Sequence, residues 1–224
     1  PPSSTRQFII NFKEGFTYIW HNAGLRALIF YATALNFLGA PLLNVVFPYF
    51  GKEVLLLEAQ QYGTIQAMLP VGFLIGTVLV GYLTKKFRKE SLLTSGITMQ
   101  GLVVGLVGFF AIPSVYGNAG LVNTLVALSS SLLLIGVLNT LVNVPFQVML
   151  QETVPDGYRG RVYGLLDSIG QMLVPLSMAL SGVLVDSLSA ASLFMFSGLI
   201  TAAFGLRMAS SAKIKLLYAE QEAA

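Results

Sequence analysis

The chain has no cysteine and only one histidine, His21, among its 224 residues. The first absence excludes disulfides, zinc–thiolate sites and thiol nucleophiles, and the second excludes most metal sites and most histidine-dependent catalysis. Charged residues are also scarce, at 10% of the chain, whereas an ordinary soluble domain is about a quarter charged. This deficit excludes a normal soluble globule, a disordered chain and a nucleic-acid-binding protein. We expect neither a cofactor nor a metal site.

Long apolar runs take the place of the missing charge. Hydrophobic residues make up 55% of the chain, and the mean hydropathy is +0.75. A helix needs about 20 mostly apolar residues to cross a bilayer, and residues 91–151 hold enough for two spans, with a break between Pro113 and Gly120. The runs do not alternate as the strands of a membrane barrel do. We therefore predict an all-α polytopic membrane protein with six spans, at about residues 26–49, 61–84, 91–112, 119–150, 160–185 and 188–209.

Basic residues predict the orientation of these spans, because lysine and arginine collect in cytoplasmic loops. With six spans, all of the 13 Lys and Arg residues except Lys52 fall on one side of the membrane. Losing or adding one span would destroy this separation. The charges therefore predict a multi-pass protein with both termini in the cytoplasm.

The first 24 residues differ in character from the spans. Aromatic residues recur there at helical spacing, as Phe8, Phe12, Phe16 and Trp20, which predicts an amphipathic helix. This helix either lies in the cytoplasmic membrane interface, anchored by Trp20, or packs on the protein's own cytoplasmic face. The Pro-Pro-Ser-Ser start is typical of an interior linker or of the edge of an expressed fragment, rather than of a natural N-terminus. We expect an interfacial segment at 1–24, a six-helix domain at 25–215 and a cytoplasmic tail at 216–224.

Amide side chains form a stripe on the fourth predicted span, where Asn139, Asn143 and Gln147 recur every four residues. Asn36 and Asn44 add two amides to the first span. Amides facing lipid are costly, so the stripe should face the bundle interior or a cavity. It could line a substrate path for an amphipathic ligand, or it could hold neighbouring helices together through hydrogen bonds.

Asp167 is the one acidic residue well inside a predicted span. Ionisable side chains in the membrane cost about 2.5–3.5 kcal/mol on insertion scales and mark functional sites by default. Asp167 could carry a proton that couples proton flow to export. Alternatively, it could pair with Arg159 or Arg161, or face water, without any role in proton transfer.

Residues 81–89, Gly-Tyr-Leu-Thr-Lys-Lys-Phe-Arg-Lys, resemble the G-x-L-x-D-R-x-G-R loop motif of the major facilitator superfamily. They stand where the C-terminal half of that family carries its degenerate copy. Lys85 replaces the aspartate of the motif and Arg88 its second glycine. The charge-relay role of that aspartate therefore does not carry over to this chain.

A second set of residues resembles the branch of that family with macrolide-efflux proteins and the enterobactin exporter. It consists of Val154-Pro155, Arg159-Gly160-Arg161-Val162 and Gly182-Val183-Leu184-Val185-Asp186. The resemblance implies that the chain is the C-terminal six-helix half of a twelve-helix transporter, with residues 1–24 linking it to a missing N-terminal half. Each half of this fold contains two three-helix units of inverted topology.

The resemblance also implies a function and a location. We expect a secondary active transporter in the bacterial plasma membrane that exports a drug-like or amphipathic molecule, of the macrolide or siderophore class, by alternating access. Its partners would be the bilayer, the other half, the substrate and H+. The sequence contains no G-x-x-x-x-G-K-[ST] motif for ATP, so a cotransported ion must supply the energy.

The two alternatives to a transporter are an intramembrane enzyme and a membrane module without transport activity. Six spans would suit an intramembrane protease, but His21 lies outside every predicted span and leaves no base for a serine, so we expect no enzyme. The chain could also be an isolated six-helix membrane module that transports nothing without its other half.

Two basic clusters are expected at the cytoplasmic ends of the spans. A position of these clusters at the cytoplasmic membrane surface, beside anionic lipid, explains them without further assumption. In the family that the chain resembles, such loops also make charge contacts that hold one access state closed, and Glu90, Glu152 and Asp156 are nearby partners here. The residues of this candidate loop and gating motif are Gly81, Lys85, Lys86, Arg88, Lys89, Arg159, Gly160 and Arg161.

Overall fold

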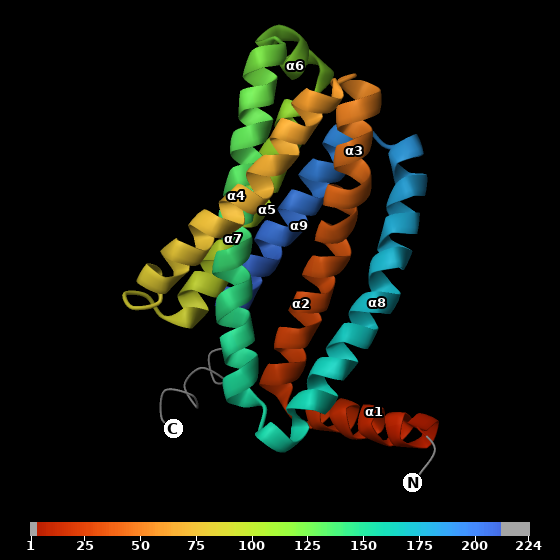
Figure 1. Cartoon of the computed structure of the whole chain (residues 1–224), viewed down its shortest axis with the longest axis vertical. Helices are drawn as coiled ribbons and strands as arrows, with labels where there is room; N and C mark the ends of the chain where they lie inside the picture. Colours follow the sequence, from red (N-terminus) through yellow and green to blue (C-terminus); the bar gives the residue numbers. More distant parts are fainter. Residues whose placement is uncertain (1–3, 212–224) are drawn as a thin grey trace.

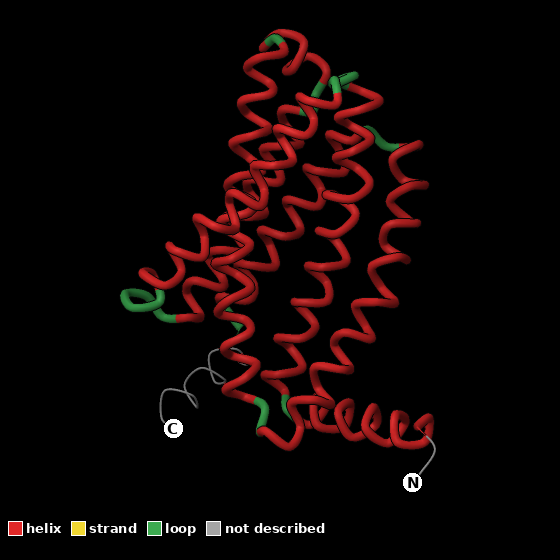
Figure 2. The backbone as a smooth tube through the Cα atoms, in the orientation of Figure 1, coloured by secondary structure: helices red, strands yellow, loops and turns green. Residues whose placement is uncertain are grey.

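The computed structural model describes residues 4–211, with side chains described from residue 10 onward. In this part of the chain, helices joined by short loops make up the fold and no strand is present (Figure 2). Six helical segments are long and apolar enough to cross a membrane, which confirms the predicted fold class. They are Ala23–Val54, α4 (Ala59–Leu83), α5 (Lys89–Phe110), α7 (Leu121–Thr153), α8 (Asp156–Ser187) and α9 (Ala190–Ala209).

The first span is longer than the sequence predicts, because it runs on past residue 49. It consists of α2 (Ala23–Pro41), η1 (Leu42–Val46), α3 (Phe47–Tyr49) and η2 (Phe50–Val54). The two η segments are π-helical: the N–H of Phe47 bonds to the carbonyl of Leu42, and that of Leu55 bonds to the carbonyl of Phe50. These wider turns let the helix continue through Pro41 and Pro48, which have no N–H to donate.

Local signals explain where the other helices begin and end. The Asn22 side chain accepts a hydrogen bond of 2.9 Å from the N–H of Leu25, and so caps α2. α7 stops before Pro155, since a residue that precedes proline is driven out of helical geometry. The short helix α6 (Pro113–Ala119) occupies the predicted break. It ends at Gly120, whose φ of 76° favours a residue without a side chain.

The six spans pack as two interlocked triplets. The first triplet holds the α2–η2 span, α4 and α5, and the second holds α7, α8 and α9. The second helix of each triplet packs on the first helix of the other, α4 on α7 and α8 on α2, while α5 and α9 pack on each other. This exchange is the pattern expected of two inverted three-helix units. α5 also packs on α7, so α4, α7, α5 and α9 form a continuous row (Figure 1).

Glycines let the helices of this row approach closely. Gly72 of α4 faces Gly136 of α7, and a Cβ added at either would clash with the main chain of the other helix. On the α5–α9 seam, a Cβ added at Gly198 would lie 2.6 Å from the carbonyl oxygen of Gly101. Within lipid the hydrophobic effect does not drive helices together. Close packing at small residues such as these stabilises the helix contacts instead.

α1 (Ser4–His21) lies across the ends of α2 and α8 (Figure 1). One edge of it packs on the protein: Gly15 contacts the main chain of Arg161, and Ile19 is buried. Its other edge leaves Phe12, Phe16 and Trp20 exposed. The helix thus packs on the bundle and also presents an aromatic strip outward. The Phe8 side chain and the tail at 216–224 lie outside what the structure describes.

Candidate functional site

A cavity of about 240 Å³ lies between α2 and α7, with α5 and α9 behind it. Three of the five predicted path residues line it: Asn36 from α2, and Asn139 and Asn143 from α7. The first helix of each triplet therefore contributes amides to one space. The other polar residues of the lining are Tyr31, Gln100 and Thr201.

The hydrogen bonds of these amides stay within their own helices. Asn143 Nδ2 donates to Asn139 Oδ1 at 2.7 Å and to the Asn139 carbonyl at 2.9 Å. Asn36 Nδ2 donates to the carbonyl of Ala32 at 3.0 Å. Since none of these bonds joins two helices, they do not act as interhelical links. The Asn36 and Asn143 amide donors are satisfied within their own helices, and the side-chain carbonyl oxygens give the cavity a set of neutral acceptors.

The rest of the cavity wall is apolar. It includes Leu28, Leu93, Ile97 and Met208, which are buried in one hydrophobic cluster, and Phe146, which packs against that cluster. A wall with a few amides set in aliphatic and aromatic surface suits a ligand that is itself amphipathic.

The other two predicted path residues do not line this cavity. Asn44 and Gln147 are exposed, and Asn44 Nδ2 donates to the carbonyl of Ala40 at 2.7 Å. Tyr31 and Thr201 were not singled out from the sequence. They come from helices far apart in the chain, and their single polar groups stand out only once the helices are packed.

Asp167 is exposed on α8, three turns from the start of that helix. The two arginines that the sequence offers as partners are engaged elsewhere. Arg159 pairs with Asp156, and Arg161 pairs with Glu14 at 3.0 Å. Within the described part of the chain, Asp167 makes no ion pair, and it lies outside the cavity lining.

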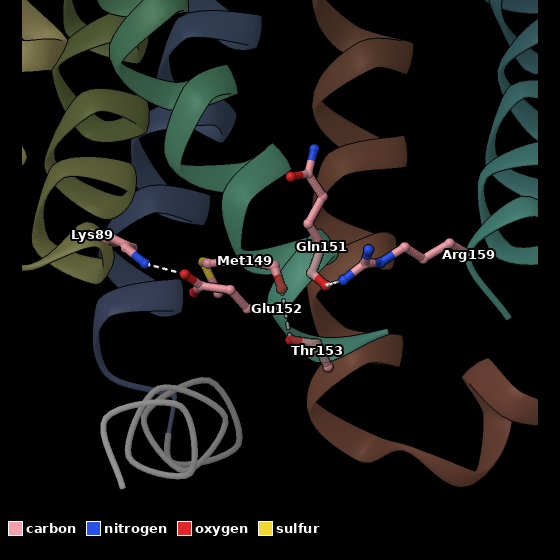
Figure 3. Close-up of polar contacts among 6 residues, drawn as sticks. All are labelled: Lys89, Met149, Gln151, Glu152, Thr153 and Arg159. Atoms are coloured by element: carbon pink, nitrogen blue, oxygen red, sulfur yellow. Dashed lines mark hydrogen bonds and ion pairs between the residues drawn. The ribbon is translucent and has the colours of Figure 1, made fainter. Parts of the chain in front are cut away.

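The C-terminal end of α7 makes polar contacts with α5 and with α8 (Figure 3). Lys89 of α5 makes an ion pair with Glu152. Arg159 of α8 donates to the carbonyls of Gln151, at 2.7 Å, and Val154, at 3.1 Å. Arginine suits this position because the last carbonyls of a helix have no partner within it and carry partial negative charge.

A second set of contacts joins α1 to α8. Besides the Glu14–Arg161 pair, the Tyr18 ring stacks on Tyr158 with centroids 4.7 Å apart. Burial, with a smaller contribution from Tyr158, raises the pKa of the Tyr18 hydroxyl. The protonated hydroxyl donates to the carbonyl of Thr153 at 3.3 Å.

Residues 29–216 match the family profile of the Major Facilitator Superfamily. The chain belongs to this superfamily. It is 26% identical over 202 residues to macrolide efflux protein A of Streptococcus pyogenes, a match that covers 85% of the chain and 44% of that protein. It is 25% identical over 185 residues to the multidrug efflux pump Tap of Mycolicibacterium fortuitum, covering 82% of the chain and 41% of the pump.

This major facilitator chain thus spans less than half the length of these two relatives. A third relative, an uncharacterized transporter of Bacillus subtilis named YfiS, is 31% identical over 134 residues, or 58% of the chain and 30% of that protein. No solved structure gives a significant match. The family and the two efflux-named relatives agree with the resemblance found in the sequence.

The superfamily loop motif spans the end of α4 and the start of α5, where Lys89 pairs with Glu152 of α7. The Lys86 ammonium lies over the ring of Tyr82, 4.5 Å from its centroid, and Lys85 is exposed. Arg88 stands at the N-terminal cap of α5. Gly81, like Gly160 on α8, has no atom within 4 Å of the place a Cβ would take, so neither is required by close packing here.

Proposed function

We propose that this chain is the C-terminal half of a secondary active transporter that exports an amphipathic small molecule, of the macrolide or siderophore class. The observation that carries the proposal is the cavity between α2 and α7, with Asn36, Asn139 and Asn143 set in an apolar wall. The efflux names of two relatives support the direction of transport.

The mechanism proposed is alternating access between this bundle and a second six-helix half. The amides lie on the first helix of each triplet, so one path could run along both. Asn44 and Gln147, on the same two helices but outside the cavity, would extend the path. Neutral acceptors suit a substrate that carries hydroxyl or ammonium donors.

Proton coupling is proposed to run through Asp167. This carboxylate lies within a span, is exposed on α8 and has no ion-pair partner in the described structure. An acid with these properties can take up a proton at one face and release it at the other when the two halves rock. Membership of the superfamily supports a transporter rather than an enzyme.

The gating contacts are proposed to be Lys89–Glu152 and Arg161–Glu14. Both lie at the end of the bundle that holds the basic loop and α1 (Figure 1). We assign this end to the cytoplasm of a bacterial cell because lysine and arginine collect there. α1 would then link the two halves, with its aromatic strip in the membrane interface.

The proposal is tested in the full-length protein by the variant Asp167→Asn, which keeps the shape of the side chain but cannot ionise. We expect uphill export to be lost while substrate binding remains measurable. Asp186→Asn is the matched control, because it removes an exposed acid near the other end of the same helix. Unchanged uphill export by Asp167→Asn would refute the proton-carrying role.

The second candidate is a six-helix membrane module that transports nothing alone. One observation favours it for the chain by itself: the match covers only 44% of macrolide efflux protein A. Transport by vesicles that contain this chain alone would exclude the second candidate. Transport that appears only when a second half is added supports the proposal above, and no transport in either case supports the second candidate.

A further inference from the structure

A second cavity, of about 650 Å³, lies at the end of the bundle where α2 begins and α9 ends. Two arginines line it, Arg26 in the first turn of α2 and Arg207 in the last turn of α9. Trp20, Ser210 and Ser211 are also part of its lining. The described lining contains no acidic residue.

Among the described residues, Arg26 is held in place by Trp20 and not by a carboxylate. Arg26 donates to the carbonyl of Trp20 at 2.9 Å, and its guanidinium lies over the Trp20 ring, 5.0 Å from the centroid. Neither Arg26 nor Arg207 takes part in an ion pair with a residue that the structure describes. In this part of the chain, two positive charges therefore face one space and no negative charge balances them.

An apolar groove of about 360 Å³ continues from this cavity along the span. Phe30 lines both spaces and so joins them. On α2 the groove follows Phe30, Ala34 and Leu38 at intervals of four residues, in line with Arg26. On α9 it follows Ile200 and Phe204, in line with Arg207.

The length of this stripe matches one leaflet of a bilayer. Arg26 and Leu38 are twelve residues apart in sequence, so at about 1.5 Å per residue they are separated by roughly 18 Å along the helix. Half of a hydrocarbon core of about 30 Å is about 15 Å. The two helices therefore place a cationic site at the membrane surface and an apolar track through the adjoining leaflet.

We propose that this composite site binds an anionic phospholipid, with its phosphate at Arg26 and Arg207 and an acyl chain in the groove between α2, α8 and α9. Arginine binds phosphate in a planar, bidentate geometry, and Trp20 suits the headgroup level of the membrane. The bound lipid would neutralise the two charges and fill the groove beside α2. The site is separate from the amide-lined cavity, and the proposal does not depend on the transported substrate.

The test is native mass spectrometry of the full-length protein with phosphatidylglycerol or phosphatidylethanolamine of identical acyl chains. We expect the anionic lipid to bind more tightly. Arg26→Gln/Arg207→Gln should bind it about 30-fold more weakly, from about 1 kcal/mol for each basic residue at the surface. Equal binding of the two lipids by the unaltered protein would overturn the proposal.

Controls separate this site from general attraction and from misfolding. Lys13→Gln removes one exposed charge at the same end of the molecule and should leave binding within about twofold. Arg207→Gln alone changes an exposed residue and should weaken binding without altering the unfolding temperature. An equal loss from Lys13→Gln and Arg207→Gln would show only diffuse electrostatic attraction and overturn the site.

The groove is tested through chain length. Ala34→Trp should weaken binding of dioleoyl phosphatidylglycerol by filling the groove, and the dihexanoyl lipid should bind the unaltered protein less tightly than the dioleoyl lipid. Equal binding of the dioleoyl and dihexanoyl lipids would show that the groove does not hold an acyl chain. Displacement of bound phosphatidylglycerol by a macrolide at this site would identify a substrate doorway instead and contradict the lipid assignment.

Discussion

At the scale of single residues, Arg159 makes two kinds of contact that differ in their contribution to stability. Its bonds to the carbonyls of Gln151 and Val154 satisfy two acceptors at the end of α7, where carbonyls lack partners within the helix. Its ion pair with Asp156 is a surface pair, since the Asp156 side chain is 87% exposed. Exposed pairs contribute about 0–1 kcal/mol, and many contribute nothing measurable.

We therefore predict that Arg159→Gln lowers stability by about 1–2 kcal/mol, through the loss of charge-assisted bonds to the main chain. Asp156→Asn should change it by less than about 0.5 kcal/mol. Thermal unfolding of both variants in the same detergent provides the comparison. Equal destabilisation would mean that the ion pair, and not the capping of α7, is what matters.

The path residues give a second prediction at this scale. Asn143→Leu removes a polar group whose bonds all lie within α7, so it should leave the unfolding temperature nearly unchanged while it weakens substrate binding. Equilibrium binding and thermal unfolding of the same sample distinguish these effects. A drop in unfolding temperature with unaltered affinity would show that the amide serves packing.

Sequence alone found part of this site, for a physical reason. The four-residue spacing of Asn139 and Asn143 marks a helix face, and amides must avoid lipid, so their inward position could be predicted. Which residues of α5 and α9 lie opposite depends on packing between helices that are distant in sequence. Gln100 and Thr201 have no local pattern that would assign them to the cavity.

At the scale of elements, glycines at close helix contacts should matter more for stability than glycines that face open space. In Gly198→Ala the added methyl group would lie 2.6 Å from the Gly101 carbonyl oxygen, so α5 and α9 would have to separate. We predict a loss of about 1–3 kcal/mol, typical of overpacking.

The matched control for this seam is Gly164→Ala on α8. No atom lies within 4 Å of the new methyl group, and alanine is the better helix former. Unfolding in detergent should show no loss for this variant. Similar losses for both variants would mean that the effect comes from the backbone and not from the contact between α5 and α9.

The helices were predictable to within a few residues because each has a long apolar run bounded by charge or proline. The π-helical end of the first span was not, since Lys52 and Glu53 read as a loop in sequence yet lie within η2. There the continuous backbone bonding of the π turns outweighs the local charge. The close contact of α4 with α7 at Gly72 and Gly136 was not predictable, because it depends on packing between helices that are distant in sequence.

At the scale of the whole molecule, the interlocked triplets form one compact six-helix bundle. The superfamily fold pairs two six-helix halves around a central path, and we propose that this bundle is one of them. An antibody against this chain should therefore detect a polypeptide of about twice its 24.1 kDa in source membranes. A band near 24 kDa would mean that a second copy must complete the path, or that the chain is a separate module.

If the amides between α2 and α7 face a substrate path, water must reach them. Labelling of Asn143→Cys in the full-length protein with a membrane-impermeant maleimide tests this access. The chain has no cysteine of its own, so the labelled peptide can be assigned by mass spectrometry. Leu199→Cys, an exposed position on α9, is the control for a lipid-facing site.

We predict that Asn143→Cys is labelled, that a macrolide slows this labelling, and that Leu199→Cys is not labelled. Failure to label Asn143→Cys, or equal labelling of both positions with no protection by substrate, would contradict a substrate path between these helices.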